Sequence, residues 1–452
     1  MELAGKNILV IGTKRSGIAA VELLIKQGAR VQAMDENPLA AEEQAKFDRM
    51  GVPVVRQAPE NFAPNGQFAD MIVLSPAVPF DLPMLDPAKK RGLPVIGEIE
   101  LASYFLRGPV IGITGSNGKT TTTALTGHLL SECGIACQVG GNIGTAAASM
   151  IDSSKDNQWN VLELSSFQLE SIFHFRAEIG CCLNLTPDHL DRHYTVERYA
   201  AAKARLFETQ QSGDLAVLNY ADERCREFAK RTNAEVYWFS VSGEVPQGVS
   251  MKGDELRFND RPFMRRSQIK LRGLHNVENV MAAALMARLA GAKLDLIGPA
   301  VQSFPGVEHR IEFVRELDGV TYYNDSKATN VDATLKAIAA FSGNLWIILG
   351  GKDKGSDYRP LRDPLRERAK AALLIGAEPP YPYAAAPLIK KALDNAVPIA
   401  DCGTLQKAVK YAHANAIAGD VVLLAPACAS FDQFENYEHR GATFKQLVAE
   451  LF

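Results

Sequence analysis

The sequence predicts an α/β fold built on parallel sheets that are flanked by helices. Short apolar, β-rich runs alternate with helical stretches along the whole chain, which is the pattern of such sheets. Almost every unusual polar cluster lies just after one of these runs. Open α/β sheets bind their ligands beyond the carboxyl ends of the strands, so we expect the functional sites at these clusters.

The length of 452 residues is enough for more than one core and predicts two or three domains. We place one boundary near Gly97 and another near Gly306, where Phe304 and Pro305 interrupt a helical stretch. The predicted segments are residues 1–97, 98–306 and 307–452. The expected strands are Asn7 to Ile11, Arg30 to Met34, Met71 to Leu74, Val110 to Ile113, Val161 to Leu164, Ile179 to Leu185, Trp346 to Leu349, Ala371 to Ile375 and Val421 to Ala425.

The charge and composition exclude several classes of protein. The 49 basic and 52 acidic residues give a formal net charge of -3, with no long basic run to follow a nucleic acid or an anionic membrane. No apolar run approaches the roughly 20 residues that span a bilayer, and the segment before the first strand does not look like a signal peptide. The seven cysteines show no zinc-type pairing, and their odd number favours a reducing compartment. We expect a cytoplasmic protein with no nucleic-acid partner and no membrane insertion.

The strongest motif is a glycine-rich loop, Gly-Ile-Thr-Gly-Ser-Asn-Gly-Lys-Thr at residues 112–120, between a strand and a helical run. Backbone N–H groups of such a loop can hold phosphate oxygens, while Lys119 can reach the terminal phosphates and Thr120 can ligate Mg²⁺. The strict Walker spacing is not met, because Ile113 stands where that pattern has glycine. A glycine turn with an incidental lysine is the alternative. The candidate nucleotide-binding residues are Gly115, Ser116, Asn117, Gly118, Lys119, Thr120 and Thr121.

Three further residues can take part in metal binding. Glu163 lies at the end of an expected strand, where its carboxylate can reach a metal on the nucleotide. His189 follows the next strand in a polar loop, although lone histidines in such loops are more often not ligands. Mg²⁺ prefers oxygen ligands, so a histidine beside it suggests a second, mixed site. On spacing alone, Lys203 is equally well explained as a solvated lysine on the surface of a helix.

These motifs together resemble the Mur ligase family. The resemblance rests on the loop at 112–120 and on residues 162–168, 188–192, 275–279, 324–330 and 426–432, which occur in the family's order across nearly the whole chain. The last two segments are most similar to the branch that adds D-glutamate. The resemblance implies an ATP-dependent amide ligase that joins D-glutamate to UDP-N-acetylmuramoyl-L-alanine through an acyl phosphate, in the synthesis of the peptidoglycan precursor.

The resemblance also implies a domain plan and a metal centre. The plan is an N-terminal Rossmann-like domain for the uridine nucleotide, a central P-loop ATPase domain with a parallel sheet, and a C-terminal Rossmann-like domain for the amino acid, in a monomer. Lys203 is expected to be carbamylated, which turns an ammonium into an oxygen ligand. Two Mg²⁺ ions are expected, one held by Thr120 and Glu163 and the other by His189 and the Lys203 carbamate. Either His189 or Asp188 could deprotonate the amine, and the sequence leaves this open.

The N-terminal glycine turn, residues 12–17, supports two interpretations. It follows the first strand, and Asp35 ends the second strand 18 residues after Gly17, as in a dinucleotide-binding fold. Lys14 replaces the middle glycine of that fingerprint, which makes a nicotinamide dehydrogenase the weaker interpretation. Under the family resemblance, the turn holds the diphosphate and the strand ends line the uracil pocket. The residues concerned are Arg15, Ser16, Asp35, Glu36, Asn37 and Ser75.

The resemblance assigns the other site residues to two groups. Asn276, Asn279, Arg310 and Asp325 are expected beside ATP, although the asparagines could be helix caps and the arginine could form an ordinary salt bridge. Asn142, Ser165 and Gln168 are expected along the substrate channel, and a tight turn alone would also explain Asn142. The D-glutamate site is expected at Lys327, Thr329, Lys354, Ser430, Phe431 and Tyr437.

Rival functions lack part of this pattern. A nucleotide switch or motor ATPase would keep the phosphate loop but would not need the C-terminal cluster of residues suited to a dicarboxylate. Within the ligases, a relative that adds another amino acid and a folate polyglutamate ligase remain the nearest alternatives.

Overall fold

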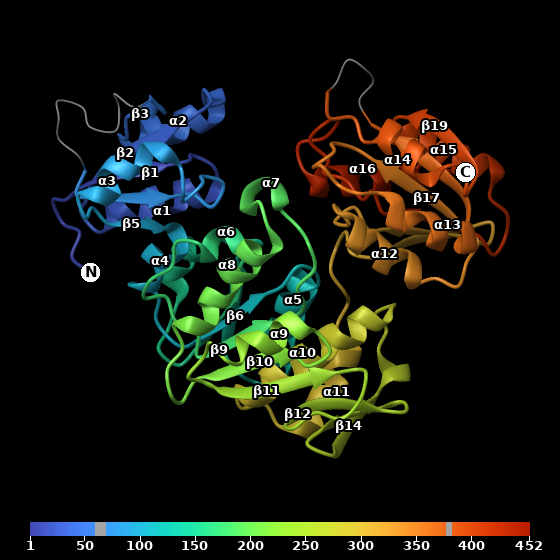
Figure 1. Cartoon of the computed structure of the whole chain (residues 1–452), viewed down its shortest axis with the longest axis horizontal. Helices are drawn as coiled ribbons and strands as arrows, with labels where there is room; N and C mark the ends of the chain where they lie inside the picture. Colours follow the sequence, from blue (N-terminus) through green and yellow to red (C-terminus); the bar gives the residue numbers. More distant parts are fainter. Residues whose placement is uncertain (59–68, 377–381) are drawn as a thin grey trace. The chain divides into compact units, whose positions relative to one another are not determined.

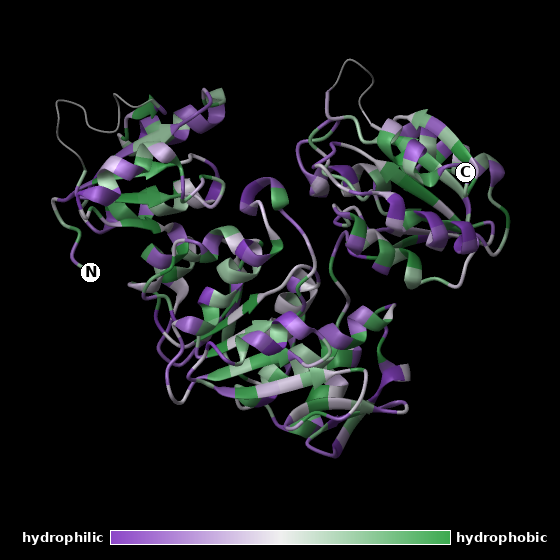
Figure 2. Cartoon of the chain, viewed as in Figure 1, coloured by the Kyte–Doolittle hydropathy of each residue, from purple (hydrophilic) through white to green (hydrophobic). Residues whose placement is uncertain are grey.

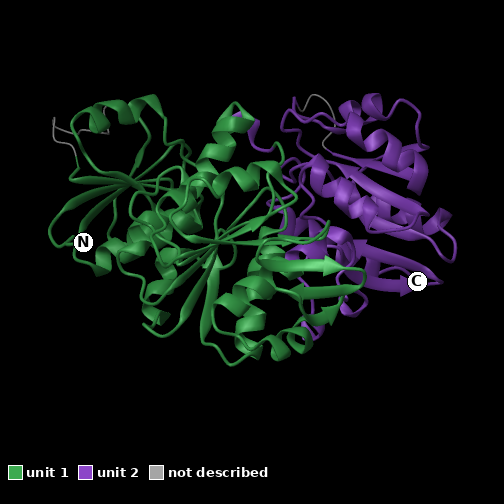
Figure 3. Cartoon of the chain, turned by 60° about the horizontal axis from the view of Figure 1, so that its bottom comes forward, with its two compact units in different colours: residues 1–187, 192–265, 280–301 green, residues 188–191, 266–279, 302–452 purple. Residues whose placement is uncertain are grey.

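The structure is a computed structural model that describes residues 1–58, 69–376 and 382–452. The described residues form three β-sheets accompanied by helices (Figure 1). The chain packs as two compact units (Figure 3): unit 1 comprises residues 1–187, 192–265 and 280–301, and unit 2 comprises residues 188–191, 266–279 and 302–452. The predicted α/β class with three domains is confirmed, whereas the boundaries at residues 97 and 306 stay predictions.

The first sheet of unit 1 is fully parallel, with the strand order β3-β2-β1-β4-β5. Its central strand β1 is an uninterrupted apolar run because helices cover both faces of such a sheet. The strands are β1 (Asn7–Ile11), β2 (Arg30–Asp35), β3 (Val54–Arg56), β4 (Met71–Leu74) and β5 (Val95–Gly97). The helices are α1 (Arg15–Lys26), α2 (Ala41–Met50), η3 (Pro83–Leu85), α3 (Asp86–Lys90) and α4 (Glu98–Ser103).

The second sheet of unit 1 has the strand order β14-β13-β12-β11-β10-β9-β6-β8-β7. It is parallel from β7 to β12, as the prediction of a central domain with a parallel sheet requires, and β13 and β14 add an antiparallel extension at one edge. The strands are β6 (Val110–Thr114), β7 (Cys137–Gly141), β8 (Trp159–Glu163), β9 (Ile179–Cys182), β10 (Leu215–Asn219), β11 (Glu235–Ser240), β12 (Gly248–Lys252), β13 (Glu255–Phe258) and β14 (Arg261–Arg265).

The helices that follow the strands of the second sheet lie between residues 119 and 303. Glycine in the left-handed conformation follows α5, since Gly134 has a φ of 75°, as expected for the end of that helix. The helices are α5 (Lys119–Glu132), η4 (Ala147–Ser153), α6 (Ser166–Leu169), α7 (Leu190–His193), α8 (Val196–Glu208), α9 (Glu223–Phe228), η5 (Arg266–Gln268), α10 (Leu274–Leu289) and α11 (Leu294–Ser303).

The sheet of unit 2 has the strand order β15-β16-β20-β17-β18-β19, with only β15 antiparallel to its neighbour. Figure 2 shows apolar colours along the strands and mixed colours on the helices, as expected for sheets buried between helical layers. The strands are β15 (Glu312–Leu317), β16 (Val320–Asn324), β17 (Leu345–Gly350), β18 (Ala369–Ile375), β19 (Ile399–Gly403) and β20 (Val421–Leu424). The helices are α12 (Val331–Ala339), η6 (Arg359–Leu361), α13 (Arg362–Arg368), α14 (Ala386–Leu393), α15 (Leu405–Asn415) and α16 (Tyr437–Ala449).

All nine expected strands occur, with one clear error of length. The strand expected from Ile179 to Leu185 ends at Cys182, because the backbone of Asn184 turns to accept a hydrogen bond from the N–H of Ser116. Among the helices that the structure describes, none is long and apolar enough to cross a bilayer.

Candidate functional site

The phosphate loop joins β6 to α5 in unit 1, as the sequence predicts. Two of its glycines have left-handed backbone angles, with φ of 144° at Gly115 and 87° at Gly118. Gly115 also leaves no room for a side chain, because an added Cβ would lie 3.0 Å from the Cβ of Leu183. The glycines therefore let the chain turn sharply into α5, whose N-terminus carries the partial positive charge that favours phosphate.

Two lysine ammonium groups converge on the same carbonyl of this loop. Lys119 Nζ lies 2.9 Å from the Gly115 oxygen and 3.0 Å from the Ser116 oxygen. Lys203 Nζ lies 2.9 Å from the Gly115 oxygen and 3.2 Å from Thr114 Oγ1. Only 1% of Lys203 is exposed, so the alternative of a solvated surface lysine is wrong. Burying an ammonium is costly, and here it is positioned directly at the phosphate loop.

Glu163 lies between two partners at the end of β8. Its Oε2 accepts a hydrogen bond of 2.7 Å from Thr120 Oγ1, and its Oε1 accepts one of 2.8 Å from the Asn142 side chain. Glu163 is buried, and its backbone oxygen also accepts the Asn142 N–H. A hydroxyl and a carboxylate oxygen at this separation are the donor set that Mg²⁺ prefers, so Thr120 and Glu163 fit the first predicted metal site.

The loop after β9 supports the phosphate loop through residues that the sequence analysis did not select. Asn184 Oδ1 accepts the N–H of Asn117, and the Asn184 side chain donates back to the Asn117 carbonyl. Ser116 Oγ donates to the Thr186 carbonyl and accepts a hydrogen bond from the Tyr199 hydroxyl. Asn184 lay inside the strand that we expected from Ile179 to Leu185, so that prediction did not mark it as a loop residue.

His189 belongs to unit 2, whereas Glu163 and Lys203 belong to unit 1. Its backbone is left-handed, with a φ of 53°, and its N–H donates to Asp188 Oδ1. His189 Nε2 lies 3.8 Å from Asp188 Oδ2, which also accepts a hydrogen bond of 3.0 Å from Asn330. The second metal site, formed by His189 and Lys203, stays a prediction.

The N-terminal turn is held by Asp35. Its Oδ2 accepts both the N–H and the hydroxyl of Thr13, at 2.9 and 2.6 Å, while its Oδ1 accepts the Asn37 N–H. Burial alone would raise the pKa of Asp35, but these hydrogen bonds outweigh it and lower that pKa. Gly17 lets helix and turn approach closely, since a Cβ there would lie 1.8 Å from the Gly12 oxygen. These hydrogen bonds hold the turn in one conformation, and they occupy both carboxylate oxygens of Asp35.

The remaining uridine-side residues have varied surroundings. Arg15 is exposed and donates from Nη2 to the Asn142 carbonyl at 2.8 Å. Ser75 is buried beneath Gly12, whereas Glu36 and Asn37 are exposed and Ser16 is half-buried. Their contacts with a nucleotide stay predictions.

Ser165 and Gln168 form a capping box at the start of α6. Ser165 Oγ accepts the N–H of Gln168, and the Gln168 side chain accepts the N–H of Ser165. This satisfies backbone donors at the helix start, so the two residues have a structural role whether or not they contact a substrate.

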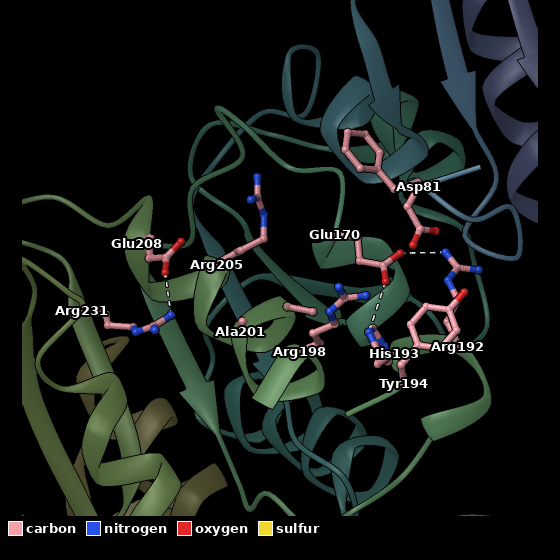
Figure 4. Close-up of a pocket in the computed structure, with 12 residues that line it drawn as sticks. Asp81, Glu170, Arg192, His193, Tyr194, Arg198, Ala201, Arg205, Glu208 and Arg231 are labelled. Atoms are coloured by element: carbon pink, nitrogen blue, oxygen red, sulfur yellow. Dashed lines mark hydrogen bonds and ion pairs between the residues drawn. The ribbon is translucent and has the colours of Figure 1, made fainter. Parts of the chain in front are cut away.

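A groove of about 310 Å³ in unit 1 lies along α8 and was not predicted (Figure 4). Glu170 pairs there with Arg192 and His193, and Glu208 pairs with Arg231. Arg192 also donates to the carbonyls of Ala77 and Val78. One wall of the groove therefore fixes the loop after β4 that carries Ser75. The lining residues are Phe80, Asp81, Glu170, Arg192, His193, Tyr194, Arg198, Ala201, Ala202, Arg205, Glu208 and Arg231.

The four residues expected beside ATP from outside the phosphate loop lie in unit 2. Helix α10 begins at Leu274, so neither Asn276 nor Asn279 is its N-cap. Both are buried, and the Asn279 side chain donates to Asn276 Oδ1 at 2.9 Å. Arg310 Nη1 lies 3.5 Å from Asp325 Oδ1. Burial raises the pKa of Asp325 even though Arg310 opposes this rise. The place of Arg310 beside ATP stays a prediction.

Five of the six predicted D-glutamate residues lie on loops at the carboxyl ends of β16, β17 and β20, and Tyr437 is the first residue of α16. Lys327 Nζ lies 3.1 Å from the Tyr437 hydroxyl, and the Thr329 N–H donates to the Lys327 carbonyl. Lys354 is half-buried in the loop after β17. In the loop after β20, Ser430 is buried and Phe431 is 64% exposed. The three loops gather because β16 and β17 are both neighbours of β20 in the sheet.

Profiles of three domains from one family match the chain. They are the Mur ligase MurD-like N-terminal domain at residues 6–97, the Mur ligase middle domain at residues 113–287, and the Mur ligase glutamate ligase domain at residues 309–428. A UDP-N-acetylmuramoylalanine–D-glutamate ligase from Solibacter usitatus is 56% identical over 99% of this chain and 98% of its own length. The protein of the same name from Koribacter versatilis is 49% identical over 100% of this chain and 99% of its own.

Solved structures share the fold. The UDP-N-acetylmuramate–alanine ligase of Thermotoga maritima has a TM-score of 0.62 at 18% identity, covering 98% of this chain and 99% of that one. The MurF ligase of the same organism, solved with ADP, has a TM-score of 0.62 at 17% identity, covering 99% of this chain and 96% of that one. With domain profiles along the chain and relatives of such identity over its full length, the chain belongs to the Mur ligase family.

Proposed function

We propose that this chain joins D-glutamate to UDP-N-acetylmuramoyl-L-alanine, with cleavage of ATP to ADP and phosphate. The observation that carries the proposal is the Glu163 carboxylate, which is hydrogen-bonded to Thr120 at the phosphate loop. This arrangement suits a nucleotide triphosphate with its metal. The choice of the two other substrates rests on the names of relatives 56% and 49% identical over nearly their full lengths.

The reaction needs an activated carboxyl group, because a carboxylate is a poor electrophile toward an amine. A carboxylate oxygen of UDP-N-acetylmuramoyl-L-alanine attacks the γ-phosphorus of ATP, and the bond to the β-phosphate oxygen breaks to release ADP. The D-glutamate amine then attacks the carbonyl carbon of the acyl phosphate. Inorganic phosphate leaves, and the amide nitrogen loses a proton to a base that we leave unassigned between His189 and Asp188.

Residues of the chain supply charge and orientation to these steps. Lys119 and the N-terminus of α5 stabilise the negative charge that develops on the transferred phosphoryl group. Thr120 and Glu163 would hold one Mg²⁺ through oxygen atoms, and His189 with a carbamylated Lys203 would hold a second. Bound Mg²⁺ would neutralise phosphate charge and polarise the acyl oxygen.

The carbamate on Lys203 forms when its neutral amine adds to CO₂ and releases one proton. Two features favour it here. Burial disfavours the charged ammonium, and the Nζ atom lies at the phosphate loop, 2.9 Å from the Gly115 oxygen, so a carbamate there would lie near a metal on the nucleotide. A carbamate is an anionic oxygen ligand, which a site close to Mg²⁺ and phosphate can use.

We assign D-glutamate to the loops after β16, β17 and β20. Lys354 and Thr329 would bind one carboxylate, whereas Ser430 and the backbone near Phe431 would bind the other. We further propose a monomer that works in the cytoplasm, where ATP is available and the seven cysteines, all of them free thiols, stay reduced.

The deciding experiment measures phosphate release with ATP and Mg²⁺ and varies the two other substrates. UDP-N-acetylmuramoyl-L-alanine with D-glutamate should give turnover and a new amide product by mass spectrometry. L-Glutamate, L-alanine and meso-diaminopimelate should give little, and omission of either substrate should abolish sustained release. Phosphate release without an amino acid would indicate a switch or motor ATPase, and turnover with a folate and glutamate would indicate a folate polyglutamate ligase.

A further inference from the structure

Arg440 is a fully buried charged residue near the start of α16 that the mechanism above does not use. Only 1% of it is exposed. Its Nε donates to Ser326 Oγ at 3.0 Å, and its Nη2 donates to the carbonyls of Ser326 and Cys428 at 2.8 and 3.2 Å. Its Nη1 donates to the carbonyls of Cys428 and Ala429 at 3.3 and 3.4 Å.

These partners belong to two different loops of unit 2. Ser326 follows β16 and directly precedes Lys327, while Cys428 and Ala429 follow β20 and directly precede Ser430. One guanidinium group therefore joins the backbones of two loops to which we assign D-glutamate. Its rigid, planar set of donors fixes the separation of these loops, which a single flexible ammonium could not do.

The third loop, after β17, contacts the loop after β20 close to Arg440. The Lys352 N–H donates to the Ala429 carbonyl at 2.9 Å. Gly351 is packed so closely that an added Cβ would lie 2.3 Å from the Ala429 oxygen and 3.3 Å from Arg440 Nη1. Lys354 lies in this loop, so all three loops of the assigned site meet around Arg440.

Among the residues that the structure describes, the hydrogen bonds of Arg440 go to carbonyls and one hydroxyl and not to a carboxylate. Burial lowers its pKa to about 10, with the Cys428 thiol and Asp432 acting in the opposite direction. Arg440 therefore stays protonated at neutral pH. A buried positive charge beside loops that bind a dicarboxylate adds a favourable potential for that ligand.

We propose that Arg440 is a positioning residue that holds the three loops of the amino-acid site at the separation that fits both carboxylates of D-glutamate. The proposal rests on the proposed function, since it assumes that these loops bind D-glutamate. Arg440 itself acts through Ser326, Cys428 and Ala429 and is not assigned a contact with the substrate.

The test compares Arg440→Lys and Arg440→Met with the parent enzyme for all three substrates. We expect KM for D-glutamate to rise about tenfold or more, because a loss of roughly 1.4 kcal/mol of binding, within the range for one charge-assisted hydrogen bond, corresponds to a factor of ten. KM values for ATP and for the uridine substrate should change less than about twofold. Arg440→Lys keeps the charge, so its effect should be the smaller one.

Arg315→Lys is the matched control. Arg315 lies in the same unit and also donates to three backbone carbonyls, those of Val448, Ala449 and Leu451, but these are at the C-terminal end of α16. This variant should lose stability without a selective change in KM for D-glutamate. An equal change for all three substrates in both Arg440 variants, or an equal rise for D-glutamate in Arg315→Lys, would overturn the proposal. If Arg440→Met does not fold, Arg440→Lys decides.

Lys354→Ala separates this proposal from the proposed function. A selective rise of KM for D-glutamate in Lys354→Ala, with none in the Arg440 variants, refutes the positioning role alone. No selective rise in either set means that D-glutamate binds elsewhere, which refutes the assignment of the site and the inference with it.

Discussion

Replacing Glu98 with Gln should make the stability of unit 1 less dependent on pH. Glu98 opens α4 and is 1% exposed. Its Oε1 accepts the Ala148 N–H at 2.7 Å, whereas Oε2 is buried without a hydrogen-bond partner. Burial raises the pKa of Glu98 from 4.5 to about 7, although the Ala148 N–H and the charge of Arg15 oppose this. Glutamine keeps the acceptor for Ala148 and carries no titrating proton.

The size of the effect follows from proton linkage. Between pH 4.5 and about 7, folded Glu98 holds a proton that the unfolded chain has lost, so stability falls as the pH rises through this window and then stays constant. Above about pH 7, the raised pKa of Glu98 lowers the free energy of unfolding by about 3 kcal/mol, because each unit of pKa shift corresponds to 1.36 kcal/mol. From about pH 5 to about pH 8, the advantage of Glu98→Gln over the parent should grow by about 2.5 kcal/mol.

Urea unfolding followed by tryptophan fluorescence measures this difference. A Trp346→Phe background leaves Trp159 and Trp238, both of which report on unit 1. Glu197→Gln is the control, because Glu197 is exposed on α8. If the free energies of unfolding of Glu98→Gln and parent differ by the same amount at both pH values, then Glu98 is ionised in the folded protein and the reasoning is wrong.

Three further outcomes follow from the site. Lys119→Ala should remove most of the turnover with an unchanged circular dichroism spectrum, since the Lys119 ammonium donates to carbonyls of the phosphate loop; near-normal ligation would refute the phosphate-loop assignment. Lys203 should carry the mass of one added CO₂, lost on acidification, and Lys203→Glu should retain more activity than Lys203→Ala; an unmodified lysine in a substrate complex would contradict this. Lys354→Ala should raise KM for D-glutamate about tenfold with little change for ATP, which steady-state kinetics would check; unchanged kinetics would make Lys354 a solvated charge.

Elements could be predicted from the sequence where a local pattern of residues is compatible with a single backbone conformation. Central strands such as β1 and β6 are continuous apolar runs, so their positions were predicted almost to the residue. The phosphate loop was predicted because its glycines need backbone angles that other residues rarely adopt. Strands at or next to a sheet edge were missed: β3 has only three residues, β13 alternates charged and apolar residues, and β14 has an arginine at each end, so none of them gives a continuous apolar signal.

Contacts between distant segments could not be predicted in the same way. Asn184 bonds to Asn117, 67 residues away, and Arg440 bonds to Ser326, 114 residues away. No local spacing encodes these pairs, because they depend on which strands become neighbours in the sheet. The burial of Lys203 could not be predicted either, because the sequence of its helix α8 has the pattern of an ordinary amphipathic helix.

Lys203 and Arg440 share a physical property that explains why they matter. Both side chains carry an ionisable nitrogen group, both are buried, and their hydrogen bonds go to carbonyl and hydroxyl oxygens. Well-packed apolar residues at such positions often give equal or greater stability, so a buried charge is weak evidence for a stabilising role. Each of the two lies instead against a loop that we assign to an anionic substrate, the phosphate loop for Lys203 and the loops after β16 and β20 for Arg440. A cost in folding at these two positions is best explained by binding and catalysis, because strain and local conflicts are expected where function requires them.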